Sequence, residues 1–157
     1  MDVQLVAIAP PVSVQDATWV ADCLADLFAP IAGRIDELRA YLDTTLASAG
    51  GEPLATMIAV EVDGERAGLV TLVRYAMPRY LGFAYEIQEL VIVRQFRGRG
   101  VARRALELVA ERCKLDPLAR KVVIRTNVDA AKRAYASVWA ASDLTSYQAM
   151  LNLLGDA

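Results

Sequence analysis

The chain has 157 residues, of which 55% are hydrophobic and 23% are charged, and its formal net charge is −2. This length fits one compact domain over residues 1–157, and the composition is far from that of a disordered chain. The small negative charge gives no bulk attraction to nucleic acid or to an anionic membrane. The sequence contains no histidine and only two cysteines. It therefore excludes Ser-His-Asp and Cys-His catalysis and leaves too few ligands for a zinc site, so we expect no metal.

The N-terminal part predicts one strand and two helices. Residues 3–9 form a short apolar run closed by Pro10, which is typical of a first strand. Ser13 has the position of a helix N-cap, and apolar residues then recur at helical spacing as far as Pro30. A second helix carries one apolar face, made of Ile35, Leu38, Leu42 and Leu46.

The middle of the chain changes to strand patterns. Residues 55–62 and 67–75 are rich in β-forming residues, and Asp63 and Gly64 between them give a strong hairpin signal. A third apolar run, residues 84–93, leads directly into a glycine-rich loop. Three strands in series predict an antiparallel part of a sheet.

The C-terminal part alternates helices and strands. A helical pattern begins at Val101, and the remaining pattern predicts a strand over residues 121–126, a helix over 129–139 and a strand over 147–154. The strand–helix–strand order predicts a parallel crossover. We therefore expect an α/β fold with a mixed sheet and helices on both faces. The last strand is long and apolar, and it suggests pairing of two copies in a homodimer.

Neither export nor membrane insertion is predicted. The N-terminus has no basic segment of the kind that opens a signal peptide, and no apolar run approaches the roughly 20 residues that span a bilayer. Cys23 and Cys113 both lie in apolar helical patterns, which favours two buried, reduced thiols over a disulfide. We expect a cytoplasmic protein.

The glycine-rich loop has the pattern of an anion site. A strand that leads into a glycine turn and then a helix leaves backbone N–H groups unpaired at the helix start, where the helix dipole adds positive charge. The loop residues are Arg97, Gly98, Arg99, Gly100, Val101 and Ala102. Taken alone, the loop is equally consistent with a plain turn whose arginines are solvated. The Walker pattern is absent, and the acidic chain makes a nucleic-acid patch the less favoured reading.

The stretch from Glu89 to Ala102 resembles the cofactor motif of the GCN5-related N-acetyltransferase (GNAT) family, with Arg97, Gly100 and Ala102 at its defining positions. The resemblance implies a GNAT-like fold and acetyl-CoA as acyl donor. Backbone N–H groups from Arg97 to Ala102 would then bind the pyrophosphate. The pantetheine arm would lie along the main chain of Val91, Ile92 and Val93, and the N–H at about Ile92 would act as an oxyanion donor.

Proton transfer requires a base for the ammonium group and an acid for the leaving thiolate. The strand that contains Glu86 is similar to that of aminoglycoside 6′-N-acetyltransferases, which implies that Glu86 is the base; an exposed strand carboxylate or an ammonium binder is the alternative. Glu89 has the opposite parity, so a regular strand would place the two carboxylates on opposite faces, and Glu89 is interpreted as structural. By the same resemblance Tyr135 would be the acid, unless it is a packed helical tyrosine, and Asn127 would lie near the pantetheine.

The expected reaction is direct attack of a primary amine on the thioester, with a small cationic amine as acceptor. Cationic acceptors favour acidic or aromatic pockets, and the candidate contributors are Asp36, Glu37, Tyr41, Tyr80 and Tyr85. Two alternatives stay open at this point. One is a non-catalytic acyl-CoA-binding module, and the other is an acetyltransferase for protein N-termini or lysines.

Overall fold

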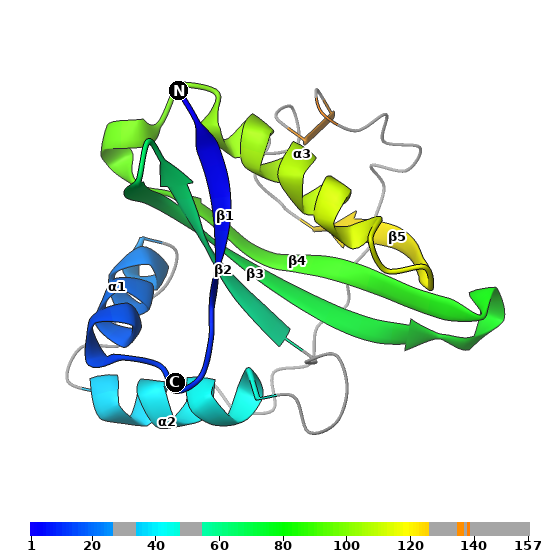
Figure 1. Cartoon of the computed structure of the whole chain (residues 1–157), viewed down its shortest axis with the longest axis horizontal. Helices are drawn as coiled ribbons and strands as arrows, with labels where there is room; N and C mark the ends of the chain where they lie inside the picture. Colours follow the sequence, from blue (N-terminus) through cyan, green and yellow to red (C-terminus); the bar gives the residue numbers. More distant parts are fainter. Residues whose placement is uncertain (27–33, 48–54, 126–134, 137, 139–157) are drawn as a thin grey trace, which may run out of the picture. The chain divides into compact units, whose positions relative to one another are not determined.

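The computed structural model describes residues 1–26, 34–47, 55–125, 135, 136 and 138 (Figure 1). The chain divides into two compact units, Met1–Ile124 and Arg125–Ala157. Among its described residues, the first unit contains the sheet, three α-helices and two short 3-10 helices. In the second unit Tyr135 and Ala136 are helical, while Asn127, most of the predicted helix 129–139 and the whole predicted strand 147–154 lie outside the described residues. The homodimer inferred from that strand stays a prediction.

In the described part of the chain, the first unit is built on a sheet of five strands that lie in chain order. Neighbouring strands are antiparallel except β4 and β5, which are parallel and joined through helix α3. The mixed sheet predicted from the sequence is therefore confirmed. The strands are β1 Val3–Ile8, β2 Ala55–Val62, β3 Glu65–Met77, β4 Gly82–Ile92 and β5 Ala119–Ile124, and the α-helices are α1 Val14–Ala25, α2 Ile35–Thr45 and α3 Val101–Cys113.

The predicted start of α1 and the predicted hairpin are both present. The hydroxyl of Ser13 accepts a hydrogen bond from the N–H of Asp16 at 3.0 Å and donates to its carboxylate at 2.7 Å, which caps the helix. Asp63 and Gly64 both have positive φ, 52° and 84°, as the tight turn between two antiparallel strands requires. Between β3 and β4, the short helix η1, Pro78–Tyr80, makes the turn.

The two faces of the sheet carry different layers. Met57, Leu69 and Val91 share one face and belong to a core cluster that includes residues of α1 and α2. The other face is apolar as well, and its residues Ile58, Val60, Val70, Leu72 and Ile87 are at most 3% exposed. Helix α3 covers that second face, because Asp116, just after α3, binds side chains of β3 and β4 that project from it (Figure 1). Helices therefore lie on both faces of the sheet, as predicted.

Strand β4 contains one residue more than its partner β3 at the same place. Thr71 pairs with Glu89, but the next residue, Leu72, pairs with Ile87, so Gln88 is a β-bulge. The surplus residue reverses the parity of the strand, and Glu86 and Glu89 consequently lie on one face. The expectation that they face opposite sides is wrong, because it assumed a regular strand.

No helix among the described residues is long and apolar enough to cross a membrane.

Candidate active site

The glycine–arginine loop leaves the start of α3 open. Gly98 and Gly100 have φ of 72° and 79°, in the left-handed region that favours glycine, and an added Cβ would meet nothing within 4 Å at either position. Gly100 is the N-cap of α3 and has no side chain to bind the first helical N–H groups. With no side-chain cap, these donors and the positive end of the helix dipole are suited to an anion, as in phosphate-binding helix starts.

Arg97 is anchored to the fold. Its Nε donates to the carbonyl oxygen of Ile92 at 2.7 Å, and its terminal nitrogen donates to the Asp26 carboxylate at 2.7 Å. The side chain thus ties the beginning of the loop to the end of β4 and to the C-cap of α1. It holds the loop in shape. Because the side chain is used in this way, only the backbone N–H of Arg97 is expected to contact a phosphate.

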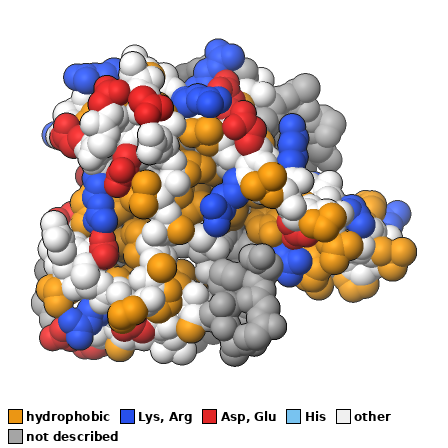
Figure 2. Space-filling view, viewed as in Figure 1, with side chains coloured by type: hydrophobic (Ala, Val, Ile, Leu, Met, Phe, Trp, Pro, Cys, Tyr) orange, Lys and Arg blue, Asp and Glu red, His pale blue; other side chains and the backbone are white. Residues whose placement is uncertain are grey.

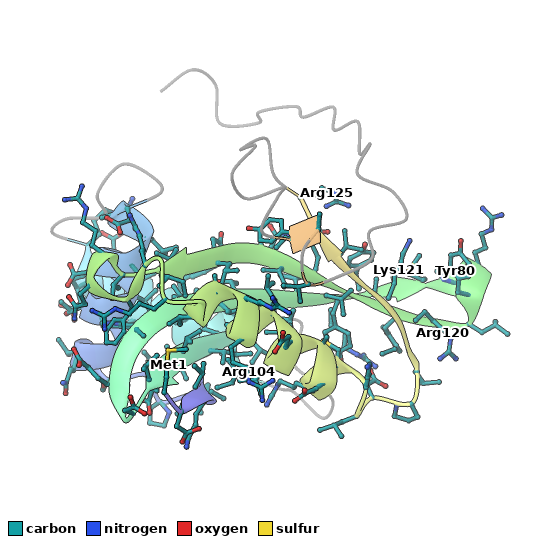
Figure 3. All side chains as sticks on the ribbon, turned by 90° about the horizontal axis from the view of Figure 1, so that it is seen from above. Met1, Tyr80, Arg104, Arg120, Lys121 and Arg125 are labelled. Atoms are coloured by element: carbon teal, nitrogen blue, oxygen red, sulfur yellow. The ribbon has the colours of Figure 1, made fainter. Side chains whose placement is uncertain are left out.

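Two further arginines of this region lie on the surface of α3. Arg103 binds Glu107 at 3.2 Å, and Arg104, labelled in Figure 3, binds Glu107 at 3.1 Å and Glu111 at 3.7 Å. Exposed ion pairs contribute only about 0–1 kcal/mol, so these arginines can exchange partners readily. Figure 2 shows acidic and basic side chains interspersed on this face of the protein, which does not form the continuous positive surface of a nucleic-acid site.

Beyond the bulge, β4 has one edge without a strand beside it in the described part of the chain. The pairing of β4 with β5 ends at Ile87 and Ile124. On the other edge, the N–H of Val93 donates to the carbonyl of Ala67, next to β3, at 2.9 Å. Because N–H groups alternate in direction along a strand, the N–H of Ile92 points to the open edge. Of the three residues predicted beside the pantetheine, Ile92 therefore presents its N–H there, while that of Val93 is already used.

Gly68 keeps β3 close to this part of β4. A Cβ at Gly68 would lie 2.4 Å from the carbonyl oxygen of Val91 and 2.7 Å from Cδ1 of Ile92. Any side chain there would push away the main chain predicted to face the cofactor.

Glu86 and Glu89 line the face of the sheet that α1 and α2 cover. Glu86 is 9% exposed and pairs with Val73, and Glu89 pairs with Thr71. The two carboxylates are therefore next to each other on this face, because the pair between them, Leu72 and Ile87, faces the other side. Thr71 is 8% exposed, and its hydroxyl oxygen has no hydrogen-bond partner among the described residues. Sequence analysis missed Thr71, because a threonine inside a strand is unremarkable until its hydroxyl is found buried and unpaired.

Tyr85, a predicted acceptor contact, lies on the opposite face, beneath α3. Its hydroxyl donates to the Asp116 carboxylate at 2.9 Å, and Asp116 also binds Arg74 at 3.2 Å. Desolvation, followed by the neighbouring Asp116 carboxylate, raises the pKa of Tyr85 to about 12. Tyr85 therefore supports the fold and does not share a face with Glu86.

The other predicted acceptor contacts lie on separate elements. Tyr80 lies in η1 at the far end of the β3–β4 hairpin, with Arg120 bound to its carbonyl oxygen at 3.0 Å and Lys121 beside its ring (Figure 3). Exposed apolar side chains cover this end of the hairpin in Figure 2. On α2, Glu37 pairs with Arg34 at 2.5 Å, Asp36 shares the first turn, and Tyr41 is exposed. The contact of these side chains with the acceptor stays a prediction.

Tyr135, the predicted acid, belongs to the second unit. Burial raises the pKa of its hydroxyl, which keeps the group protonated at neutral pH. Its catalytic role stays a prediction, as does the role of Asn127.

The family model for the acetyltransferase (GNAT) family matches residues 22–138, a range that includes β4, the glycine loop and α3. The chain belongs to the acetyltransferase (GNAT) family. It is thus an acetyl-CoA-dependent N-acetyltransferase, and the uncapped start of α3 and the open edge of β4 fit such a donor. No curated protein sequence matches this acetyltransferase significantly.

Solved structures of acetyltransferases share the fold of this family member. Ribosomal-protein-alanine N-acetyltransferase from Brucella melitensis biovar Abortus 2308 is 20% identical, with a TM-score of 0.69 over 96% of this chain and 100% of that chain. Glucosamine-6-phosphate N-acetyltransferase from Arabidopsis thaliana is 16% identical, with a TM-score of 0.74 over 98% and 99%. An aminoglycoside acetyltransferase from an uncultured soil metagenomic sample, solved in complex with sisomicin, is 10% identical, with a TM-score of 0.68 over 96% and 97%. At these identities the likeness concerns the fold alone.

Proposed function

We propose that this acetyltransferase transfers the acetyl group of acetyl-CoA to the primary amine of a small cationic acceptor by direct attack. One observation carries the proposal. A single stretch of chain, residues 86–102, holds a buried carboxylate, then an open strand edge, and then a glycine loop at an uncapped helix start. Base, acyl-arm platform and phosphate site therefore follow one another in the order that the reaction needs.

The proposed donor site uses backbone more than side chains. N–H groups from Arg97, Gly98, Arg99, Gly100, Val101 and Ala102 hold the pyrophosphate at the start of α3. The main chain of Val91, Ile92 and Val93 lies beside the pantetheine arm, with Asn127 as a further contact. The N–H of Ile92, which points to the open edge, donates to the carbonyl oxygen as negative charge develops there.

The proposed proton transfers use two side chains. Acetyl-CoA supplies a thioester carbonyl as the electrophile. Glu86 accepts a proton from the acceptor ammonium group, which frees the nitrogen lone pair to form the N–C bond. As the C–S bond breaks, Tyr135 donates its hydroxyl proton to the departing sulfur. The position of Glu86 supports its role, since the carboxylate lies on β4, the strand that leads to the open edge and the glycine loop.

A small acceptor is preferred over a protein substrate because Glu86 is almost fully buried. A carboxylate with 9% exposure is reached more easily by a compact amine than by a folded polypeptide. We further propose a cytoplasmic setting, which suits the two free, buried thiols of Cys23 and Cys113.

Thermal-shift titrations with acetyl-CoA, CoA, NAD and ATP test the donor first. A ligand at about 100 times its Kd adds about 2.7 kcal/mol of stability. At about 2–4 °C per kcal/mol this is a rise of several degrees. We expect that rise with acetyl-CoA and CoA and none with NAD. The absence of a shift with both CoA species would overturn the proposed donor site.

Turnover of Glu86→Gln and Tyr135→Phe then tests the proton transfers in an amine screen. Each variant is expected to lose about 100-fold or more in kcat while its acetyl-CoA affinity stays near that of the unmodified enzyme. Glu61→Gln, which removes a carboxylate on β2, serves as the matched control and should keep full activity. If neither variant changes turnover, or if no amine is acetylated although CoA binds, a non-catalytic acyl-CoA-binding module is the better description.

A further inference from the structure

The bulge at Gln88 places a second carboxylate beside the proposed base. Glu86 and Glu89 pair with Val73 and Thr71, which are two residues apart on one face of β3. Residues in that relation are on the order of 7 Å apart along a strand. The two glutamates are therefore neighbours on a single surface, although two residues separate them in the sequence.

Apolar residues border this pair on one side. In the row of the sheet that contains Glu89, the preceding positions are Ile8 and Met57, both members of the core cluster under α1 and α2. Val91, two residues beyond Glu89 on β4, belongs to the same cluster. Glu89 is partly buried and continues a row of core residues, so a cation that pairs with its carboxylate would have apolar side chains on one side.

Thr71 is the independent sign of a ligand at this place. Its side chain lies on the same face as Glu89, directly across the β3–β4 pair, and its hydroxyl oxygen is buried with no hydrogen-bond partner among the described residues. Buried hydroxyls are nearly always paired, so this one marks a place where a bound polar group would complete the pairing. A hydroxyl oxygen accepts hydrogen bonds, and an ammonium group donates three.

The charges of the site indicate what the partner is. During the reaction proposed above, one ammonium group gives its proton to Glu86 and becomes neutral, so it cannot balance Glu89 as well. Among the described residues, no third acidic side chain joins Glu86 and Glu89 to form a group that could hold a metal ion. A second ammonium group on the same acceptor satisfies both Glu89 and Thr71.

We propose that Glu89 and Thr71 bind a second ammonium group of the acceptor, so that the enzyme selects diamines over monoamines. This inference rests on the proposed amine acetylation and narrows its substrate class. Glu86 handles the reacting nitrogen, and Glu89, one row away, holds the nitrogen that does not react. Aliphatic diamines, polyamines and diamino sugars share the required chemistry, because each presents two cationic nitrogens a few bonds apart.

The test compares two acceptors of matched chain length, putrescine with two amines and n-butylamine with one. The unmodified enzyme should show a kcat/KM for putrescine about 10- to 100-fold above that for n-butylamine, the range that one charge-assisted hydrogen bond provides. Glu89→Gln should bring that ratio close to unity by lowering only the putrescine value. Glu61→Gln should leave the ratio unchanged. A ratio near unity in the unmodified enzyme, or one that Glu89→Gln does not alter, would overturn the inference.

The Thr71→Val variant distinguishes a role in substrate binding from a role in stability. Valine keeps the shape and removes an unpaired buried hydroxyl, so the melting temperature should hold or rise. The preference for putrescine should nevertheless fall several-fold. A variant that keeps the full preference would contradict the role of Thr71.

Equilibrium binding separates this inference from the proposed function. Calorimetric titration of putrescine and n-butylamine into the unmodified enzyme and Glu89→Gln requires no acetyl transfer. If no amine is acetylated but putrescine binds selectively and Glu89→Gln removes that selectivity, the diamine site stands and the catalytic proposal fails. If amines are acetylated but putrescine binds no better than n-butylamine, the diamine site fails and the catalytic proposal stands.

Discussion

The guanidinium of Arg97 joins the carbonyl oxygen of Ile92 to the carboxylate of Asp26, with 2.7 Å to each oxygen. Ile92 ends β4, and Asp26 is the C-cap of α1, so one side chain fixes the glycine loop to two elements that are distant in sequence. The contacts of Arg97 therefore hold the loop at the start of α3 in shape without a bound phosphate.

Replacement of Arg97 by Gln should weaken acetyl-CoA binding more than it weakens the fold. Loss of both contacts frees the loop, and we expect the Kd for acetyl-CoA to rise about 10-fold, equivalent to about 1.4 kcal/mol. The free energy of unfolding should change by no more than about 1 kcal/mol, because the ion pair with Asp26 is about half exposed. Calorimetry and urea denaturation measure the two quantities. Asp26→Asn keeps the Ile92 contact and should raise the Kd less than 3-fold; an equal effect in both variants would contradict this account.

Gly68→Ala should damage both stability and donor binding. The new Cβ meets the Val91 carbonyl oxygen and Ile92 Cδ1, and overpacking of this kind costs about 1–3 kcal/mol. Because the strain falls on the open-edged part of β4, the acetyl-CoA Kd should rise as well. Gly64→Ala is the matched control: its φ of 84° makes alanine costly, but nothing lies within 4 Å. It should lower stability and leave acetyl-CoA affinity intact.

The Asp116 carboxylate should make the fold sensitive to acid. The Leu118 N–H, followed by the hydroxyl of Tyr85 and the guanidinium of Arg74, holds its pKa below the ordinary value. A lowered pKa in the folded state means that the stabilisation is present above the unfolded pKa, at about pH 4, and is lost as the pH falls through the folded value. Asp116→Asn should therefore lower the urea midpoint at pH 7, and the difference from the unmodified protein should shrink towards pH 2. A difference that is constant with pH would show that the charge of Asp116 contributes nothing.

Both thiols should resist modification in the folded protein. Burial raises the pKa of Cys23 and of Cys113 to about 11, with the Asp22 carboxylate adding to the effect at Cys23 and Asp116 at Cys113. The thiolate, which is the reactive form, is therefore scarce at pH 8. A disulfide reagent should titrate no thiol rapidly in native buffer and both thiols in denaturant. Rapid reaction of one thiol in native buffer would place that side chain in a more open environment than the structure describes.

Local sequence signals predicted most of the fold because each has a short-range cause. Ser13 caps α1, and the Asp63-Gly64 pair turns the chain between β2 and β3, since both effects act within four residues. The strand over residues 84–93 was placed within two residues of the observed β4. The glycine loop was located for the same reason, because a strand, two glycines and a helix start are contiguous in sequence.

The relation between the two glutamates could not be predicted in this way. A bulge is a difference in residue number between two paired strands, and nothing in the sequence of β4 alone identifies Gln88 as the extra residue. The pairing of Thr71 with Glu89 follows only from the register of β3 against β4. The position of Tyr85 beneath α3 depends equally on Asp116, which lies far along the chain. Contacts between distant segments, rather than local propensity, decided which polar residues share a face.

The bulge also makes residue count matter more than residue identity at position 88. Gln88 is exposed, so most substitutions there should be silent. Deletion of the same residue would turn the first half of β4 over relative to the second. Ile87, now 2% exposed beneath α3, would rotate towards the carboxylate face, and Glu86 would enter the apolar layer in its place. Every side chain proposed to act in catalysis would still be present in the sequence. The one-residue shift in the register of β4 would nevertheless disrupt the core and remove the base from its face of the sheet.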